Sequence, residues 1–108
     1  MAFASEVSAS IGTSGSPSTV TPTVGSGTTL TMIGLSFANI TSTNQTVSCK
    51  VNKSGGSSAF LVKDATVLPG GALAVVGGDQ KVVLEAGDSV TAYASNSSAI
   101  DVVVSYLT

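Results

Sequence analysis

The sequence predicts an all-β protein, a single antiparallel β-sandwich of jelly-roll type with seven to eight short strands and an extended N-terminal arm. Three observations lead to this prediction. Hydrophobic residues make up 43% of the chain and 15 of them are Val, whose branched side chain favours strands. Turn-forming Gly, Asn and Asp recur about every ten residues between the apolar stretches, a spacing typical of sandwiches and barrels. No stretch shows a convincing helical periodicity.

A chain of 108 residues fits one domain, which we divide into an arm at residues 1–27 and a sandwich at residues 28–108. Residues 11–18 are rich in Gly and Ser and flexible by composition. Val20, Pro22 and Val24 then suggest a short edge strand, since proline cannot donate a ladder hydrogen bond. Apolar residues recur along the arm, which favours an arm that lies across a neighbouring protein over a free tail; they are Phe3, Val7, Ile11 and Val20.

From residue 28 onward the pattern is regular, and we expect strands at 28–38, 45–52, 59–68, 72–76, 81–84, 89–94 and 100–107. The apolar face switches sides between Met32 and Ile33, which indicates a bulge or a strand buried on both faces. Residues 59–68 are also compatible with a short helix, but the Pro-Gly-Gly that follows and the β-branched Val62, Thr66 and Val67 favour a strand.

The last predicted strand carries apolar side chains on both faces. Ile100, Val102, Val104 and Tyr106 form one face, and Val103 and Leu107 interrupt the other. Such a strand is either central and covered or presents one face to another subunit. The candidate interaction residues of the whole chain are therefore Phe3, Val7, Ile11, Val103 and Leu107.

The reactive side chains are few. The chain has 31 Ser and Thr but no His, Arg or Trp, and its four Lys against six acids give a net charge of −2. Clustered basic residues are what bind phosphate, so a nucleic-acid partner is not expected. A Ser or Cys nucleophile needs a base that is missing here, and Cys49, on the same face as Val47 and Val51, is expected to be a small buried hydrophobe.

Three acids, Asp79, Glu85 and Asp88, could converge at one end of the sandwich. A pair of carboxylates can support glycoside hydrolysis, and calcium requires about six oxygen ligands. Acids in Gly-containing turns more often supply turn hydrogen bonds, and we favour that interpretation. We expect no enzyme activity, no cofactor and no metal.

The N-terminal residues lack a basic leader with an apolar run, and no stretch approaches the ~18 apolar residues of a membrane span. We therefore expect neither a signal peptide nor a membrane partner, and synthesis in a cytoplasm.

Three segments resemble small virion structural proteins of tailed bacteriophages, those of marine and cyanobacterial phages in particular. They are Thr-Leu-Thr-Met-Ile-Gly-Leu at 29–35 with Ala-Asn at 38–39, Phe-Leu-Val-Lys-Asp-Ala at 60–65, and Leu-Ala-Val-Val-Gly-Gly-Asp-Gln-Lys-Val-Val-Leu-Glu-Ala-Gly-Asp at 73–88. Ile-Gly-Thr-Ser at 11–14 and Ser-Thr-Val at 18–20 also fit the opening of such proteins. The resemblance runs from about residue 11 to the end, and residues 75–88 are its most specific part.

The resemblance implies a small β-sandwich component of the virion with no enzymatic residues. It favours a capsid decoration (cement) protein, made in the host bacterial cytoplasm, that binds the major capsid protein and itself, commonly as a homotrimer. The alternative is a tail, neck or fibre-associated module that binds a receptor or glycan through loops such as 39–44 and 96–98.

Overall fold

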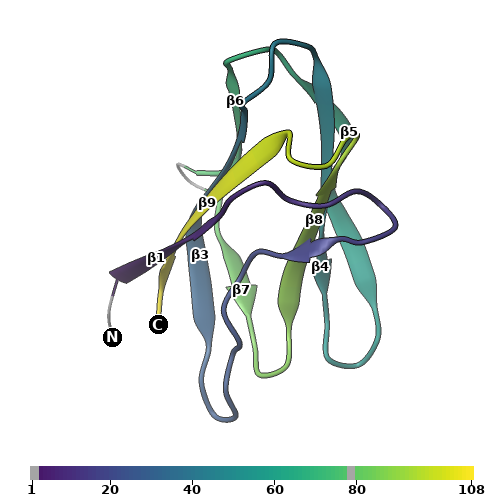
Figure 1. The fold of residues 1–108 in the computed structure, drawn as a ribbon. Coiled ribbons are helices and arrows are strands. Elements are labelled where there is room, and N and C mark those ends of the chain that lie inside the picture. The colour runs from purple at the N-terminus through teal and green to yellow at the C-terminus, as the bar shows by residue number, and fades with distance from the viewer. Residues whose placement is uncertain (1–2, 78–79) are drawn as a thin grey trace.

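The protein is a β-sandwich of two antiparallel sheets (Figure 1), as predicted. The structure is a computed structural model that describes residues 3–77 and 80–108, and this part of the chain contains nine strands and no helix. Sheet A has the order β1 (Phe3–Ser8), β9 (Ile100–Leu107), β3 (Leu30–Asn39) and β6 (Ala72–Val76), and β7 (Val82–Leu84) pairs with the first half of β3. Sheet B has the order β2 (Ser18–Thr19), β8 (Ser89–Ala94), β4 (Gln45–Asn52) and β5 (Ser58–Val67).

The core lies between the sheets and is built from alternate residues of each strand. Along β8 every second residue is buried, and β9 buries Ile100, Val102 and Val104, as the alternation predicts. Cys49 is fully buried beside Val47, which confirms its expected position. Burial raises the pKa of its thiol to about 11, so the thiolate needed for reaction is disfavoured.

The predicted change of face in the first long strand is a bulge. The pairing of β3 with β9 shifts register between Met32 and Gly34. Met32 and Leu35 are three residues apart, so in a regular strand their side chains would point to opposite faces. Both are buried in the core because the bulge adds one residue between them. Residues 58–67 form a strand and not a helix, which confirms the favoured interpretation.

The N-terminal segment belongs to the sandwich itself, in contrast to the expected arm across a neighbour. After β1 the chain crosses from one sheet to the other (Figure 1): the Ile11 N–H donates to the Ile100 carbonyl of sheet A, and the Ala94 N–H of sheet B donates to the Gly12 carbonyl. Ile11 is fully buried, so its assignment as a contact residue is wrong. A Cβ at Gly12 would lie 2.1 Å from the Ser16 carbonyl oxygen, so this crossing requires glycine.

The edge strand expected around Val20, Pro22 and Val24 lies slightly earlier in the chain. β2 is Ser18–Thr19, at the edge of sheet B beside β8. Val20 and Val24 are buried in the core, and Thr21 Oγ1 accepts the Val90 N–H. The side chains of these two valines therefore anchor the segment after the strand has ended.

Candidate interaction surfaces

Four of the predicted contact residues lie together on the outer face of sheet A. β1 pairs with β9 so that Phe3 is opposite Leu107 and Val7 is opposite Val103. Residues directly opposite in an antiparallel pair share a face, and the buried Val102 and Val104 show that this face points away from the core. Phe3 is 76% exposed, Val7 71% and Val103 44%, and Leu107 is partly exposed. We call these four residues the β1–β9 patch.

Val83 extends this apolar surface across the sheet. Thr31 of β3 lies opposite Leu107 on one side and opposite Val83 on the other, so Val83 is on the same outer face. Val83 is 54% exposed. β9 is thus a central strand between β1 and β3, but its outer face with Val103 is not covered. That this face binds another subunit stays a prediction. Exposed apolar side chains gathered on one face are typical of a protein-binding surface.

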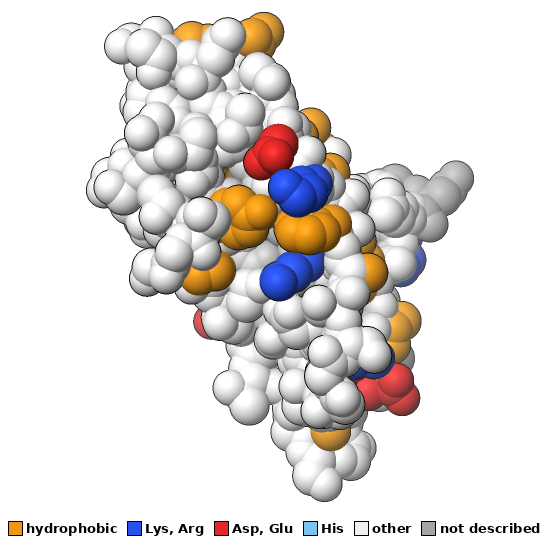
Figure 2. Space-filling view, turned by 90° about the vertical axis from the view of Figure 1, so that its right-hand side faces the viewer, with side chains coloured by type: hydrophobic (Ala, Val, Ile, Leu, Met, Phe, Trp, Pro, Cys, Tyr) orange, Lys and Arg blue, Asp and Glu red, His pale blue; other side chains and the backbone are white. Residues whose placement is uncertain are grey.

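The outer face of sheet B has a different character. The Phe60 ring lies between Lys50 and Lys63, each with its Nζ 5.6 Å from the ring centroid. Figure 2 shows this arrangement as an apolar side chain between two basic ones, with an acidic side chain beside them. Cation–π contacts of this kind hold the two lysines over the ring. The face therefore combines one half-exposed aromatic ring with a local positive charge.

A shallow cavity of about 220 Å³ lies on the sheet B side, lined mainly by hydroxyl groups. Its walls come from the crossing segment, β4, β5 and β8; the lining residues are Thr13, Ser14, Thr46, Ser48, Asp64, Tyr93, Ala94 and Ser95. Ser48 is buried and its Oγ accepts the Asp64 N–H, which fixes Asp64 at the cavity wall. The lining combines hydrogen-bonding groups with one aromatic ring, Tyr93, and the cavity is smaller and more polar than most ligand pockets.

The loops at 39–44 and 96–98, the candidate glycan contacts of the alternative interpretation, lie together. The Ile40 N–H donates to the Ala99 carbonyl, and Asn96 Nδ2 donates to Gln45 Oε1. The Asn39 side chain is buried and hydrogen-bonds within its own loop. Several of the amide groups that could contact a sugar are therefore used inside the protein.

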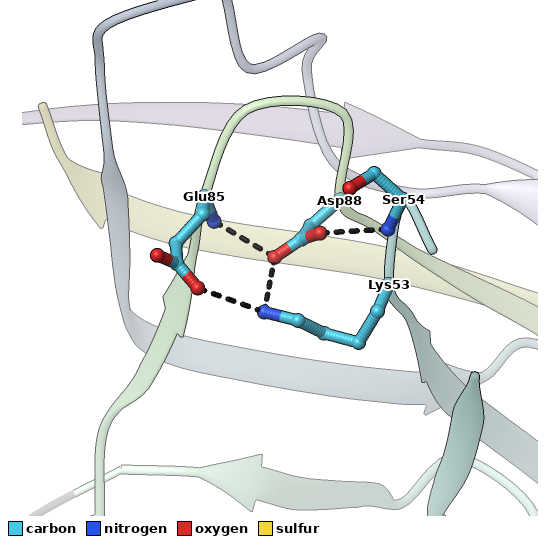
Figure 3. A network of polar contacts seen from close by, with 4 residues as sticks. All are labelled: Lys53, Ser54, Glu85 and Asp88. Carbon is cyan, nitrogen blue, oxygen red and sulfur yellow. Dashed lines mark hydrogen bonds and ion pairs between the residues drawn. The ribbon is translucent and has the colours of Figure 1, made fainter. Parts of the chain in front are cut away.

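Two of the three predicted acids meet in a polar network that joins two turns (Figure 3). Lys53 Nζ donates to Glu85 Oε1 and to Asp88 Oδ2. Asp88 also accepts the N–H groups of Glu85 and Ser54, each at 2.9 Å. The network confirms the expected turn hydrogen bonds for Asp88, and Asp79 lies outside the described residues. The side chain of Asp88 is 1% exposed, and its contacts hold the β4–β5 turn against the β7–β8 turn.

This network predicts a loss of stability in acid. The hydrogen bond from Lys53, followed by those from Glu85 and Ser54, lowers the pKa of Asp88 from 3.8 to about 2. Because the folded protein favours the charged carboxylate, Asp88 stabilises the fold at pH values above its ordinary pKa of 3.8. This contribution is lost as the pH falls from about 4 to about 2. The hydrogen bonds of Lys53 to the Asp88 carboxylate, and then to that of Glu85, raise the pKa of Lys53 from its ordinary value of 10.5, so the contribution of the lysine is lost only as the pH rises above that value.

Urea unfolding between pH 7 and pH 2 measures this contribution. The free energy of unfolding of the wild-type chain is expected to fall across the lower part of this range. Asp88→Asn is expected to be less stable at pH 7 and to lose most of this pH dependence. An Asp88→Asn variant with the same steep acid dependence as the wild type would contradict the assignment.

The described residues contain no group of three or more His, Cys, Asp or Glu side chains placed to hold a metal ion. They also include no helix long and apolar enough to cross a membrane. No protein-family model, curated protein or solved structure matches this chain.

Proposed function

We propose that this protein is a non-enzymatic virion structural protein, a capsid decoration protein that binds the major capsid protein and stabilises the joints between capsomers. The observation that carries the proposal is the apolar outer face of sheet A, formed by the β1–β9 patch and Val83. A monomer in solution gains nothing from exposing these side chains, whereas an assembly protein buries them against its neighbours.

The strand order supports the same proposal. Without the three-residue β7, residues 3–77 and 80–108 form eight strands in two sheets of four, in the orders β1-β9-β3-β6 and β2-β8-β4-β5. Each sheet combines strands from both ends of the chain, and we infer a jelly roll from this order. Jelly rolls occur in viral capsid proteins and in lectins, so the topology is compatible with the decoration function and with the glycan-binding alternative.

A copy count tests the location. Quantitative mass spectrometry of purified particles of the phage that encodes this chain is expected to find hundreds of copies per particle, which is the stoichiometry of a shell component. A dozen copies or fewer would favour a neck or tail protein. Absence of the protein from purified particles would overturn the proposal.

A pair of lysine substitutions tests which face binds the shell. Val83→Lys places a charge on the outer face of sheet A, and Thr66→Lys places the same charge on the exposed side of β5 in sheet B. In saturation binding to shells that lack the protein, Val83→Lys is expected to weaken binding by about ten-fold or more, or about 1.4 kcal/mol, and Thr66→Lys to have little effect. If Thr66→Lys weakened binding and Val83→Lys did not, the shell-binding face would be that of sheet B.

The second candidate function is glycan binding by a tail, neck or fibre module. The hydroxyl-lined cavity with Tyr93 and Asp64 favours it. In a glycan array, binding by the isolated protein that is lost in Tyr93→Ala would support this function. Binding to capsid shells with no array signal would reject it.

A further inference from the structure

We propose that two copies of this chain pair through their β1 strands, antiparallel and about a twofold axis at Ser5, so that sheet A continues from one copy into the other. The inference deepens the proposed function, because it states how the apolar face of sheet A is enlarged. It depends on an open strand edge and on the order of side chains along that edge.

β1 is the least protected strand edge in the described part of the chain. It forms one end of sheet A, pairs with β9 along all six of its residues, and is exposed on both faces along residues 3–7. Figure 1 shows it beside the end of β9, away from sheet B. A regular edge of this length offers backbone groups to another strand unless a proline, a lysine, a bulge or a very short length prevents it.

The other edges carry such protection. β2 has two residues and is soon followed by Pro22. The edge formed by β6 and β7 is divided into strands of five and three residues. β5 carries Lys63 and, beside it, Asp64 with a φ of +52°, and its pairing with β4 is interrupted by register shifts. β1 contains neither lysine nor proline, and Glu6 is its one charged residue.

The side chains of β1 select one register. A twofold axis perpendicular to the sheet keeps outward residues opposite outward residues, so the axis must pass through a residue of the strand. With the axis at Ser5, Phe3 of each copy lies opposite Val7 of the partner subunit, and Glu6 lies opposite Ala4 of the partner subunit. An axis at Glu6 would oppose two like charges, and an axis at Ala4 would leave Val7 without an opposite residue in β1.

This register joins the two apolar patches into continuous rows. In each row Leu107 lies beside Phe3, which lies beside Val7 of the partner subunit, which lies beside Val103 of the partner subunit. The symmetry axis generates a second, identical row, and Ser5 and Ser105 of both copies lie between the two rows. The four residues of the β1–β9 patch thus form one apolar surface over four adjacent strands.

Cysteine cross-linking of the full chain tests the register. The native Cys49 is buried, so an introduced cysteine is the reactive one. Ser5→Cys places two thiols at the axis, within the distance that a disulfide spans, and is expected to form a covalent dimer on mild oxidation. Glu6→Cys places its thiols diagonally, about 7–8 Å apart between Cα atoms, and is expected not to cross-link with itself. A mixture of Ala4→Cys and Glu6→Cys is expected to cross-link. Efficient cross-linking of Glu6→Cys with itself would overturn the register.

Paired charge substitutions test the interface by sedimentation equilibrium. The wild-type chain is expected to form a dimer of twice the 10.5 kDa chain mass. F3K/V7K opposes like charges and is expected to weaken the dimer by roughly a hundred-fold, whereas F3K/V7E opposes unlike charges and is expected to retain it. A wild-type monomer at all concentrations, or a trimer as the phage resemblance implies, would overturn the twofold pairing. Neither result changes the copy count per particle, so the proposed function is tested separately.

Discussion

Replacing Ile11 with alanine is expected to lower the free energy of unfolding by about 2–5 kcal/mol, the range for truncating a fully buried large aliphatic side chain. Ile11 is 0% exposed and lies where the chain crosses between the sheets, with its N–H bound to the Ile100 carbonyl. Because the core encloses the Ile11 side chain, alanine would leave a cavity that the neighbouring side chains cannot easily fill. Urea denaturation of the variant and the wild type measures the difference.

Ile40→Ala is the matched control, because it removes the same atoms from a side chain that is 53% exposed. Its cost is expected to be about 1 kcal/mol or less. Removal of residues 1–18 is expected to destabilise the domain strongly, because it deletes Ile11, the whole of β1 and Ser18 of β2. Equal costs for the two alanine variants, or a stable truncated domain, would restore the interpretation of residues 1–27 as a separate arm.

Four strands could be predicted from the sequence with correct bounds because their signals are local. The strands at 45–52, 72–76, 89–94 and 100–107 have the predicted bounds, since alternation and flanking Gly or Asn determine each of them nearby. The N-terminal segment was predicted as a separate arm because its Gly- and Ser-rich composition gives no local signal of its place in the sandwich. Its order comes from partners such as Ile100 and Ala94, more than eighty residues away in the chain.

The candidate surfaces also combine features that local sequence predicts with features that depend on distant residues. The sequence identified Phe3, Val7, Val103 and Leu107 one by one, but their meeting on one face depends on the pairing of the first strand with the last. The turn role of Asp88 follows from its position in the Glu-Ala-Gly-Asp turn. Its ion pair with Lys53 could not be predicted, because it joins turns 35 residues apart. The use of the four apolar residues as an interface stays a prediction.

The side chain of Asn39 ties the β3–β4 loop to sheet B. Asn39 is 2% exposed, and its Nδ2 donates to the carbonyls of Thr43 at 2.8 Å and Val67 at 2.9 Å. Its Oδ1 accepts the N–H and hydroxyl of Thr41. Asn39→Asp keeps the shape but replaces the donor nitrogen with an oxygen that faces two carbonyl oxygens. The expected loss is about 2–5 kcal/mol, because the buried Val67 carbonyl and the partly buried Thr43 carbonyl lose their donor and a charge is buried.

The pH dependence separates this mechanism from a general loosening of the loop. In acid the introduced carboxyl group becomes protonated and can again donate one of the two hydrogen bonds, so the cost of Asn39→Asp is expected to shrink as the pH falls from 7 to 4. Asn44→Asp makes the same change at an exposed position of the same loop and is expected to alter stability by about 0.5 kcal/mol or less at both pH values. Urea unfolding of both variants measures this. A cost for Asn39→Asp that matches Asn44→Asp, or that does not change with pH, would mean that the amide does not hold the loop, since a buried donor cannot be exchanged for an acceptor at no cost.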